Sequence, residues 1–174
     1  MRRFLFIALV ASAWPAAAQS ERTQAALKSL FPEAEHFTPK DVFLTDEALA
    51  KLQALARTKI ADRMLTFYVA SAGGKPIGYA AMHTHKVRTK NETLVVGFEP
   101  DGSIKRIDLA VFLEPEEYAP PPKWLAQFKG KAVTDRLTLG DDVMAISGAT
   151  LSAHSITETA RWLLLALKEA KLAP

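Results

Sequence analysis

In Leu65-Thr66-Phe67-Tyr68-Val69, large apolar side chains alternate with a threonine and a tyrosine, and the pair Gly73-Gly74 follows. A period of two is the pattern of a strand with one buried face. Adjacent glycines favour a tight reversal of the chain, because they accept backbone conformations that other residues avoid. This stretch therefore predicts a strand that leads into a hairpin turn.

Three more strands are predicted after this hairpin, over Pro76–Lys86, Glu92–Phe98 and Ile104–Leu113. Pro100-Asp101-Gly102 is a strong turn signal between the last two. Alternation in the last strand places four apolar residues on one face: Ile107, Leu109, Val111 and Leu113. Short loops between successive strands indicate an antiparallel meander.

Two helices are predicted before the meander. Residues 21–31 form a short helix that Pro32 stops, and a polar link follows through Pro39. Thr45-Asp46-Glu47 is typical of a helix start, and leucines at helical spacing continue to about Arg57. Both helices are expected to pack across the sheet.

After the meander, prolines in residues 114–122 favour an extended loop over a helix. Trp124–Phe128 is expected to form one helical turn, and Val133–Leu139 a final strand. A long helix from about Leu151 to Lys171 has an apolar stripe of Ile156, Ala160, Leu163, Leu167 and Ala170. The predicted fold class is α+β: an antiparallel sheet meander with N-terminal helices and a long C-terminal helix.

Residues 1–18 have the pattern of a secretory signal peptide. The segment has a basic start at Arg2-Arg3, an apolar run over Phe4–Trp14 and a cleavage site at Ala16-Ala17-Ala18. We therefore predict an exported, periplasmic protein in which residues 19–174 form a single domain.

The composition excludes several kinds of cofactor and partner. The 174 residues contain no cysteine, which rules out disulfides, thiolate metal sites, iron–sulfur clusters and covalently attached c-type haem. The net charge of +3, less the two charges of Arg2 and Arg3, leaves +1, and no basic stripe suits nucleic acid. No apolar stretch after residue 18 is long enough to span a bilayer. A flavin, or a metal held by histidine and carboxylate, remains as the redox option.

The segment Ser147-Gly148-Ala149-Thr150-Leu151-Ser152 joins a polar turn to the predicted C-terminal helix. Unpaired backbone N–H groups and the positive end of the helix dipole meet at a helix N-terminus, so a phosphate is stabilised there without a basic side chain. The small residues before Thr150 let a bulky group approach the backbone. A plainer interpretation is that Thr150 caps its own helix.

This segment resembles the flavinylation motif of the FMN-binding domain family, which includes the C subunit of sodium-pumping NADH:quinone oxidoreductase and the G subunit of the Rnf complex. In that family a phosphoester joins the last threonine of the motif to FMN, and a periplasmic, magnesium-dependent flavin transferase makes the bond from FAD. Carried over, Thr150 is the acceptor and its neighbours are cofactor-binding residues: Ser147, Gly148, Ala149, Leu151 and Ser152. Gly78-Tyr79-Ala80 and Asp101-Gly102-Ser103-Ile104 also resemble the family.

The resemblance implies a periplasmic flavoprotein with one covalent FMN, acting as an electron carrier rather than as an independent enzyme. Its implied partners are the flavin transferase and an unidentified redox protein associated with a membrane. Met144 departs from the motif, because the family usually has aspartate three residues before the serine or threonine. Two alternatives therefore stay open: a cofactor-free exported binding or sensing module, and a metal-binding domain.

A few candidate residues lie outside the motif. His83 and His85 are two apart on a predicted strand, so both rings point to one face. They suit a metal, a contact from His85 to the flavin, or two ordinary surface or cross-strand histidines. Glu114 follows the fourth strand, where larger family members carry a loop near the flavin ring, so the resemblance makes it a candidate contact. Either Arg88 or Lys90 could face an anionic flavin, or both are ordinary solvated charges near a strand end. Tyr118 and Trp124 suit stacking on a flavin, or they hold their loop to the sheet.

Overall fold

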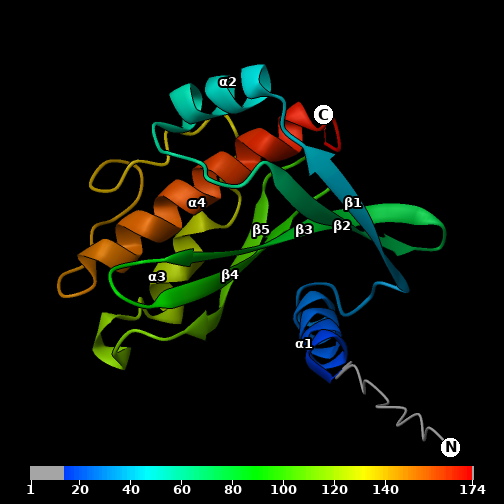
Figure 1. Cartoon of the computed structure of the whole chain (residues 1–174), viewed down its shortest axis with the longest axis horizontal. Coiled ribbons are helices and arrows are strands. Elements are labelled where there is room, and N and C mark those ends of the chain that lie inside the picture. Colours follow the sequence, from blue (N-terminus) through cyan, green and yellow to red (C-terminus); the bar gives the residue numbers. More distant parts are fainter. Residues whose placement is uncertain (1–13, 174) are drawn as a thin grey trace, which may run out of the picture.

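A five-stranded antiparallel sheet, in the order β1-β2-β3-β4-β5, forms the centre of the computed structural model, which describes residues 14–173 (Figure 1). The predicted α+β class, with its meander, N-terminal helices and long C-terminal helix, is confirmed. The strands are β1 (His36–Phe43), β2 (Met64–Ala72), β3 (Lys75–Lys86), β4 (Asn91–Phe98) and β5 (Ile104–Phe112). The helices are α1 (Trp14–Leu30), α2 (Asp46–Ala56), α3 (Pro122–Leu125) and α4 (Thr150–Glu169).

Apolar layers cover both faces of the sheet. In β4, Leu94 and Val96 belong to the larger core, which includes residues of α4 and α2, whereas Val95 belongs to a smaller core with residues of α1. Alternate residues of one strand point to opposite faces, so α1 and α4 lie on opposite sides of the sheet (Figure 1). The helix α2 packs mainly against α4. The expectation that both N-terminal helices pack across the sheet therefore holds for α1 and is wrong for α2.

Local signals set the helix ends. The hydroxyl Oγ1 of Thr45 accepts the backbone N–H of Ala48 at 3.2 Å, which confirms the predicted start of α2. The helix α1 ends at Leu30, before Pro32 as predicted, but it begins at Trp14 rather than near residue 21. The predicted signal peptide lies mostly in residues 1–13, outside the described residues, and stays a prediction.

The predicted polar link through Pro39 is wrong, because β1 occupies part of it. Most side chains of β1 are exposed, and only Phe37 and Val42 are partly covered, so the strand has no period-two pattern. Proline is tolerated here because β1 is at the edge of the sheet, where a missing N–H need not face a neighbour. Pairing with β2 makes this segment a strand.

The predicted final strand over Val133–Leu139 is also wrong, since the segment is irregular apart from an isolated bridge at its end. The carboxylate of Asp142 accepts the N–H of Leu137 at 3.0 Å and of Thr138 at 2.7 Å. Arg161 donates to the Leu137 carbonyl at 2.5 Å. Backbone N–H and carbonyl groups that would pair with a neighbouring strand are therefore hydrogen-bonded to side chains.

A bulge in β5 overturns part of the predicted alternation. The register with β4 shifts between Leu109 and Val111, where Ala110 is an extra residue. Such an insertion turns the following side chain to the other face. Ile107 is buried, whereas Val111 and Leu113 are 37% and 58% exposed, so the four apolar residues do not share one face.

Candidate functional site

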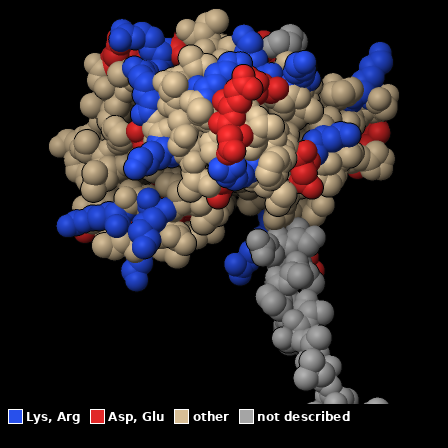
Figure 2. All heavy atoms as spheres, turned by 45° about the horizontal axis from the view of Figure 1, so that its top comes forward, with Lys and Arg blue, Asp and Glu red and all other residues tan. Residues whose placement is uncertain are grey.

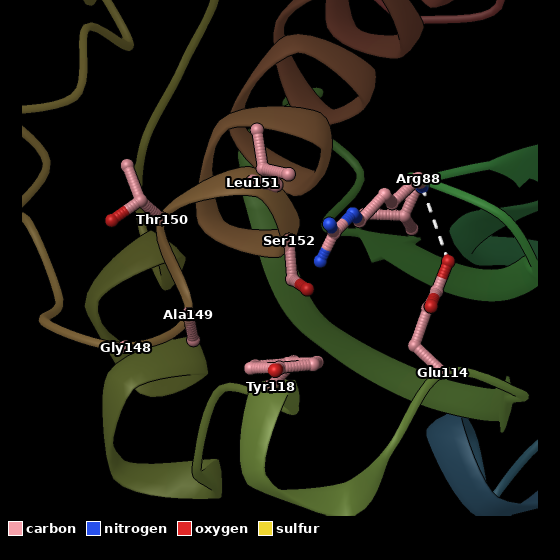
Figure 3. Close-up of a pocket in the computed structure, with 9 residues that line it drawn as sticks. Arg88, Glu114, Tyr118, Gly148, Ala149, Thr150, Leu151 and Ser152 are labelled. Atoms are coloured by element: carbon pink, nitrogen blue, oxygen red, sulfur yellow. Dashed lines mark hydrogen bonds between the residues drawn. The ribbon is translucent and has the colours of Figure 1, made fainter.

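The N-terminus of α4 forms one wall of a pocket of about 210 Å³ at the end of the sheet (Figure 3). The β3–β4 hairpin contributes Val87 and Arg88, and the chain after β5 contributes Glu114 and Tyr118. The helix wall consists of residues Gly148, Ala149, Thr150, Leu151 and Ser152. Six of the eight residues predicted to bind a cofactor therefore line this pocket. Ser147 and His85 do not line it.

The first turn of α4 has no side-chain cap. Its N-cap residue is Ala149, which has no side-chain acceptor, and Thr150 is the first helical residue. The first backbone bond of the helix runs from the N–H of Ala153 to the carbonyl of Ala149 at 2.9 Å. Thr150 instead donates its hydroxyl to the Ile146 carbonyl at 3.3 Å. The interpretation that Thr150 caps its own helix is therefore wrong, and the first-turn N–H groups stay available to an anion.

Of the two hydroxyl-bearing residues in the first turn of α4, only Thr150 is exposed. Thr150 is exposed, whereas Ser152 is only 1% exposed although it lines the pocket. Gly148 has a φ of 85°, in the left-handed region that favours glycine. A Cβ added at Gly148 would meet no atom within 4 Å, so the backbone conformation rather than space requires glycine there.

Glu114 holds the tip of the β3–β4 hairpin. Its Oε1 accepts three successive backbone N–H groups, from Arg88 at 3.2 Å, Thr89 at 2.6 Å and Lys90 at 2.7 Å. The N–H groups of Lys90 and then Thr89 hold the pKa of the Glu114 carboxyl below its usual value. The carboxylate thus lines the pocket while its hydrogen bonds go to the hairpin (Figure 3).

His83 and His85 lie on one face, as predicted, and that face is covered by α4. Their rings stack with centroids 5.1 Å apart, and the rings of His83 and Trp162 on α4 are nearly perpendicular, with centroids 4.8 Å apart. The Nε2 atom of His85 lies 2.7 Å from Oε1 of Glu92 and also contacts the hydroxyl of Ser155 on α4. His85 therefore lies beneath the helix that forms the pocket wall.

Glu92 is a functional candidate that the sequence did not single out. It is fully buried, and neither of its oxygens makes a hydrogen bond of good geometry within the described residues, nor does Nδ1 of His85. Buried polar groups are normally satisfied, so such an arrangement needs a reason. A glutamate at a strand start gives no signal of burial, because the covering helix follows some sixty residues later. Among residues 14–173 no group of three His, Cys, Asp or Glu side chains is arranged to hold a metal.

The stability of the protein is expected to fall as the pH drops from 6.5 to 4. Burial, and secondarily the charge of His85, lowers the pKa of His83 from 6.5 to about 4, against a smaller opposing effect of Asp62. The unfolded chain therefore binds a proton at this site from pH 6.5 downward, whereas the folded protein does so only near pH 4. The folded state loses about 3 kcal/mol across this window. Urea unfolding at pH 7.5 and 4.5 measures the loss, and an equal loss in His83→Gln would contradict it.

The surface has no single charged stripe on the face that Figure 2 shows, where basic and acidic side chains are interspersed. Within residues 14–173, no helix combines the length and the apolar character that a membrane crossing requires.

Comparison with known proteins supports the fold. No protein-family model matches the chain, and no curated protein matches it. The crystal structure of Shewanella oneidensis NqrC is similar, with a TM-score of 0.53 and 17% sequence identity over 84% of this chain and 90% of that chain. At this identity the likeness is one of fold. The antiparallel sheet and the long helix that begins at the pocket thus belong to an architecture that this chain shares with NqrC.

Proposed function

We propose that this protein is a periplasmic flavoprotein that carries one FMN, joined through its phosphate to Thr150, and passes electrons between redox partners. The main observation is that Thr150, an exposed residue with a hydroxyl, lines a pocket whose wall is the uncapped N-terminus of α4. A phosphate on this hydroxyl would lie beside the first-turn N–H groups and the positive end of the helix dipole. The resemblance of the motif to the FMN-binding domain family and the fold shared with NqrC support the same function.

The covalent step is a transfer of the FMN unit from FAD. The Thr150 oxygen forms a bond to the FMN phosphorus, the pyrophosphate bond of FAD breaks, AMP leaves, and the hydroxyl proton passes to solvent. Thr150 donates its hydrogen bond to a backbone carbonyl, and no histidine or carboxylate among the described residues hydrogen-bonds to its hydroxyl. The chain therefore supplies an acceptor without a base, which agrees with a separate, magnesium-dependent flavin transferase as a partner.

The pocket fits part of an FMN molecule. Its volume of about 210 Å³ is below the roughly 300–1,000 Å³ of sites that enclose a drug-sized ligand. A flavin tethered at Thr150 would therefore keep part of its ring in solvent, with the Tyr118 ring available for stacking (Figure 3). A covalent bond would retain such a weakly enclosed cofactor in the periplasm. When bound, the flavin supplies one- and two-electron transfer.

Mass spectrometry of the exported protein tests this function. The full chain would be produced together with an active flavin transferase, and the intact protein and its Thr150 peptide would be weighed. We expect one addition equal to FMN less one water, on the Thr150 peptide. Unmodified protein under these conditions would contradict the proposal.

The main alternative is a cofactor-free binding or sensing module, and Met144 is the feature that favours it. The Met144 side chain is exposed. Its backbone holds the loop in place, since its carbonyl accepts from Trp124 at 2.7 Å and its N–H donates to Gln127 at 2.7 Å. The loop is thus ordered without the aspartate that the family usually has. A colourless product made with an active transferase would support this alternative.

A further inference from the structure

Arg88 places a cation on the wall of the pocket. Its guanidinium points toward Ser152 in the close-up, and the ring of Tyr118 lines the same pocket (Figure 3). Within residues 14–173, no carboxylate oxygen lies within 4.0 Å of the guanidinium. A guanidinium presents several donors in a planar fork that suits an anionic or carbonyl-bearing planar ligand.

The backbone that carries Arg88 is fixed by a carboxylate that does not neutralise it. Oε1 of Glu114 accepts the N–H of Arg88 and of the next two residues, and Oε2 accepts the Thr89 hydroxyl at 3.2 Å. The turn is closed by the N–H of Val87, which donates to the Lys90 carbonyl at 3.1 Å. Hydrogen bonds to an ionised carboxylate are stronger than hydrogen bonds between neutral groups. The hairpin therefore holds the base of the Arg88 side chain beside the pocket.

The hairpin offers a matched comparison. Lys90 is also exposed and also donates its backbone N–H to Glu114, but it does not line the pocket. The Thr150 hydroxyl points away from Arg88 in the close-up, and Leu151 and Ser152 lie between them (Figure 3). A ligand that starts at Thr150 and crosses the pocket would thus bring its far end, not its phosphate, to Arg88.

We propose that Arg88 binds the flavin ring in this pocket, where it stabilises the negative charge that the ring gains on reduction, and that Glu114 is a positioning residue that aims Arg88 through the hairpin. The inference rests on the proposed function for its ligand. A cation near the ring favours the reduced form and raises the midpoint potential, because opposite charges attract strongly in a partly enclosed site.

The potential of the flavinylated protein tests the role of Arg88. Arg88→Gln is expected to lower the midpoint potential, Arg88→Lys to restore part of the difference, and Lys90→Gln to leave it nearly unchanged. Lys90→Gln is the control because it removes the same charge from the same hairpin. Equal shifts for Arg88→Gln and Lys90→Gln would overturn the assignment, since they would reflect only the overall charge of the hairpin.

The sign of a second shift tests the role of Glu114. Removing a negative charge near the ring would by itself raise the potential, whereas loss of the Arg88 position would lower it. We expect Glu114→Gln to lower the potential, and the double variant with Arg88→Gln to go no lower than Arg88→Gln alone. A raised potential, or additive shifts, would show that Glu114 does not act through Arg88. Thermal unfolding of each variant checks that it is folded.

Binding of free FMN separates this inference from covalent attachment. Fluorescence quenching would measure the affinity of FMN for Thr150→Ala, and adding Arg88→Gln should weaken it about tenfold, the effect of one lost charged hydrogen bond. If the native chain takes no adduct but free FMN binding depends on Arg88, the covalent proposal fails and the inference stands. If the adduct forms but neither its potential nor the affinity for free FMN changes in Arg88→Gln, the inference is overturned. It is also overturned if the protein binds no free FMN.

Discussion

Replacing Thr150 with alanine is expected to abolish the covalent flavin adduct while leaving the fold intact. Thr150 is exposed, and the one hydrogen bond that its side chain makes within the described residues goes to the Ile146 carbonyl at 3.3 Å. Alanine is a good helix former, so the first turn of α4 keeps its backbone geometry. The loss is complete because no other hydroxyl takes the place of the acceptor: Ser152 is buried, and Ser147 lies before the turn. Intact mass and the mass of the peptide with residue 150 measure the result.

Two variants make this experiment specific. Ser147→Ala removes an exposed hydroxyl three residues away and should keep the full adduct. Thr150→Ser keeps an acceptor oxygen at the same backbone position and should retain part of it. An adduct that persists on Thr150→Ala would mean that another side chain is the acceptor. An equal loss of adduct in Ser147→Ala and Thr150→Ala would mean that the transferase recognises side chains of the loop before Thr150 as well.

The predicted elements that succeed are those whose signals are local. The start of α2 follows from Thr45 and the carboxylates after it, because a cap needs only the next three residues. The strand β2 is predicted from the alternation of apolar and polar residues, because its two faces have different surroundings. β1 gives no such signal: both sides of this edge strand are largely exposed, and only pairing with β2 defines it. Val133–Leu139 has the composition of a strand, but the side chains of Asp142 and Arg161 hydrogen-bond to its backbone in place of a neighbouring strand.

The site shows the same division between local and distant information. The sequence predicts Thr150 and its neighbours as a site because the motif is contiguous and resembles a known family. It also offers Arg88 and Glu114 as separate candidates, but it does not predict the hydrogen bond between them. They are 26 residues apart in sequence, and the hydrogen bond exists only because the hairpin tip meets the end of β5. The burial of Glu92 depends in the same way on α4.

The second large effect is expected in the core, where Phe98→Ala should reduce the free energy of unfolding by about 3–5 kcal/mol. Phe98 is fully buried in the layer between the sheet and α4, and its ring lies 6.4 Å from that of Phe67. A substitution to alanine removes this apolar surface from the core and leaves a cavity that rigid neighbours fill only in part. Such a loss is a large share of the stability of a domain this size.

Phe43→Ala is the matched control, because the same side chain is 70% exposed at the end of β1. Its effect should stay within about 0.5 kcal/mol. Urea unfolding of the flavin-free chain compares the two variants without a contribution from the cofactor. Similar losses in both would mean that the layer beneath α4 is not the main source of stability. Since α4 is held by that layer, Phe98→Ala should also lower the yield of flavinylated protein at temperatures where the native chain is still folded.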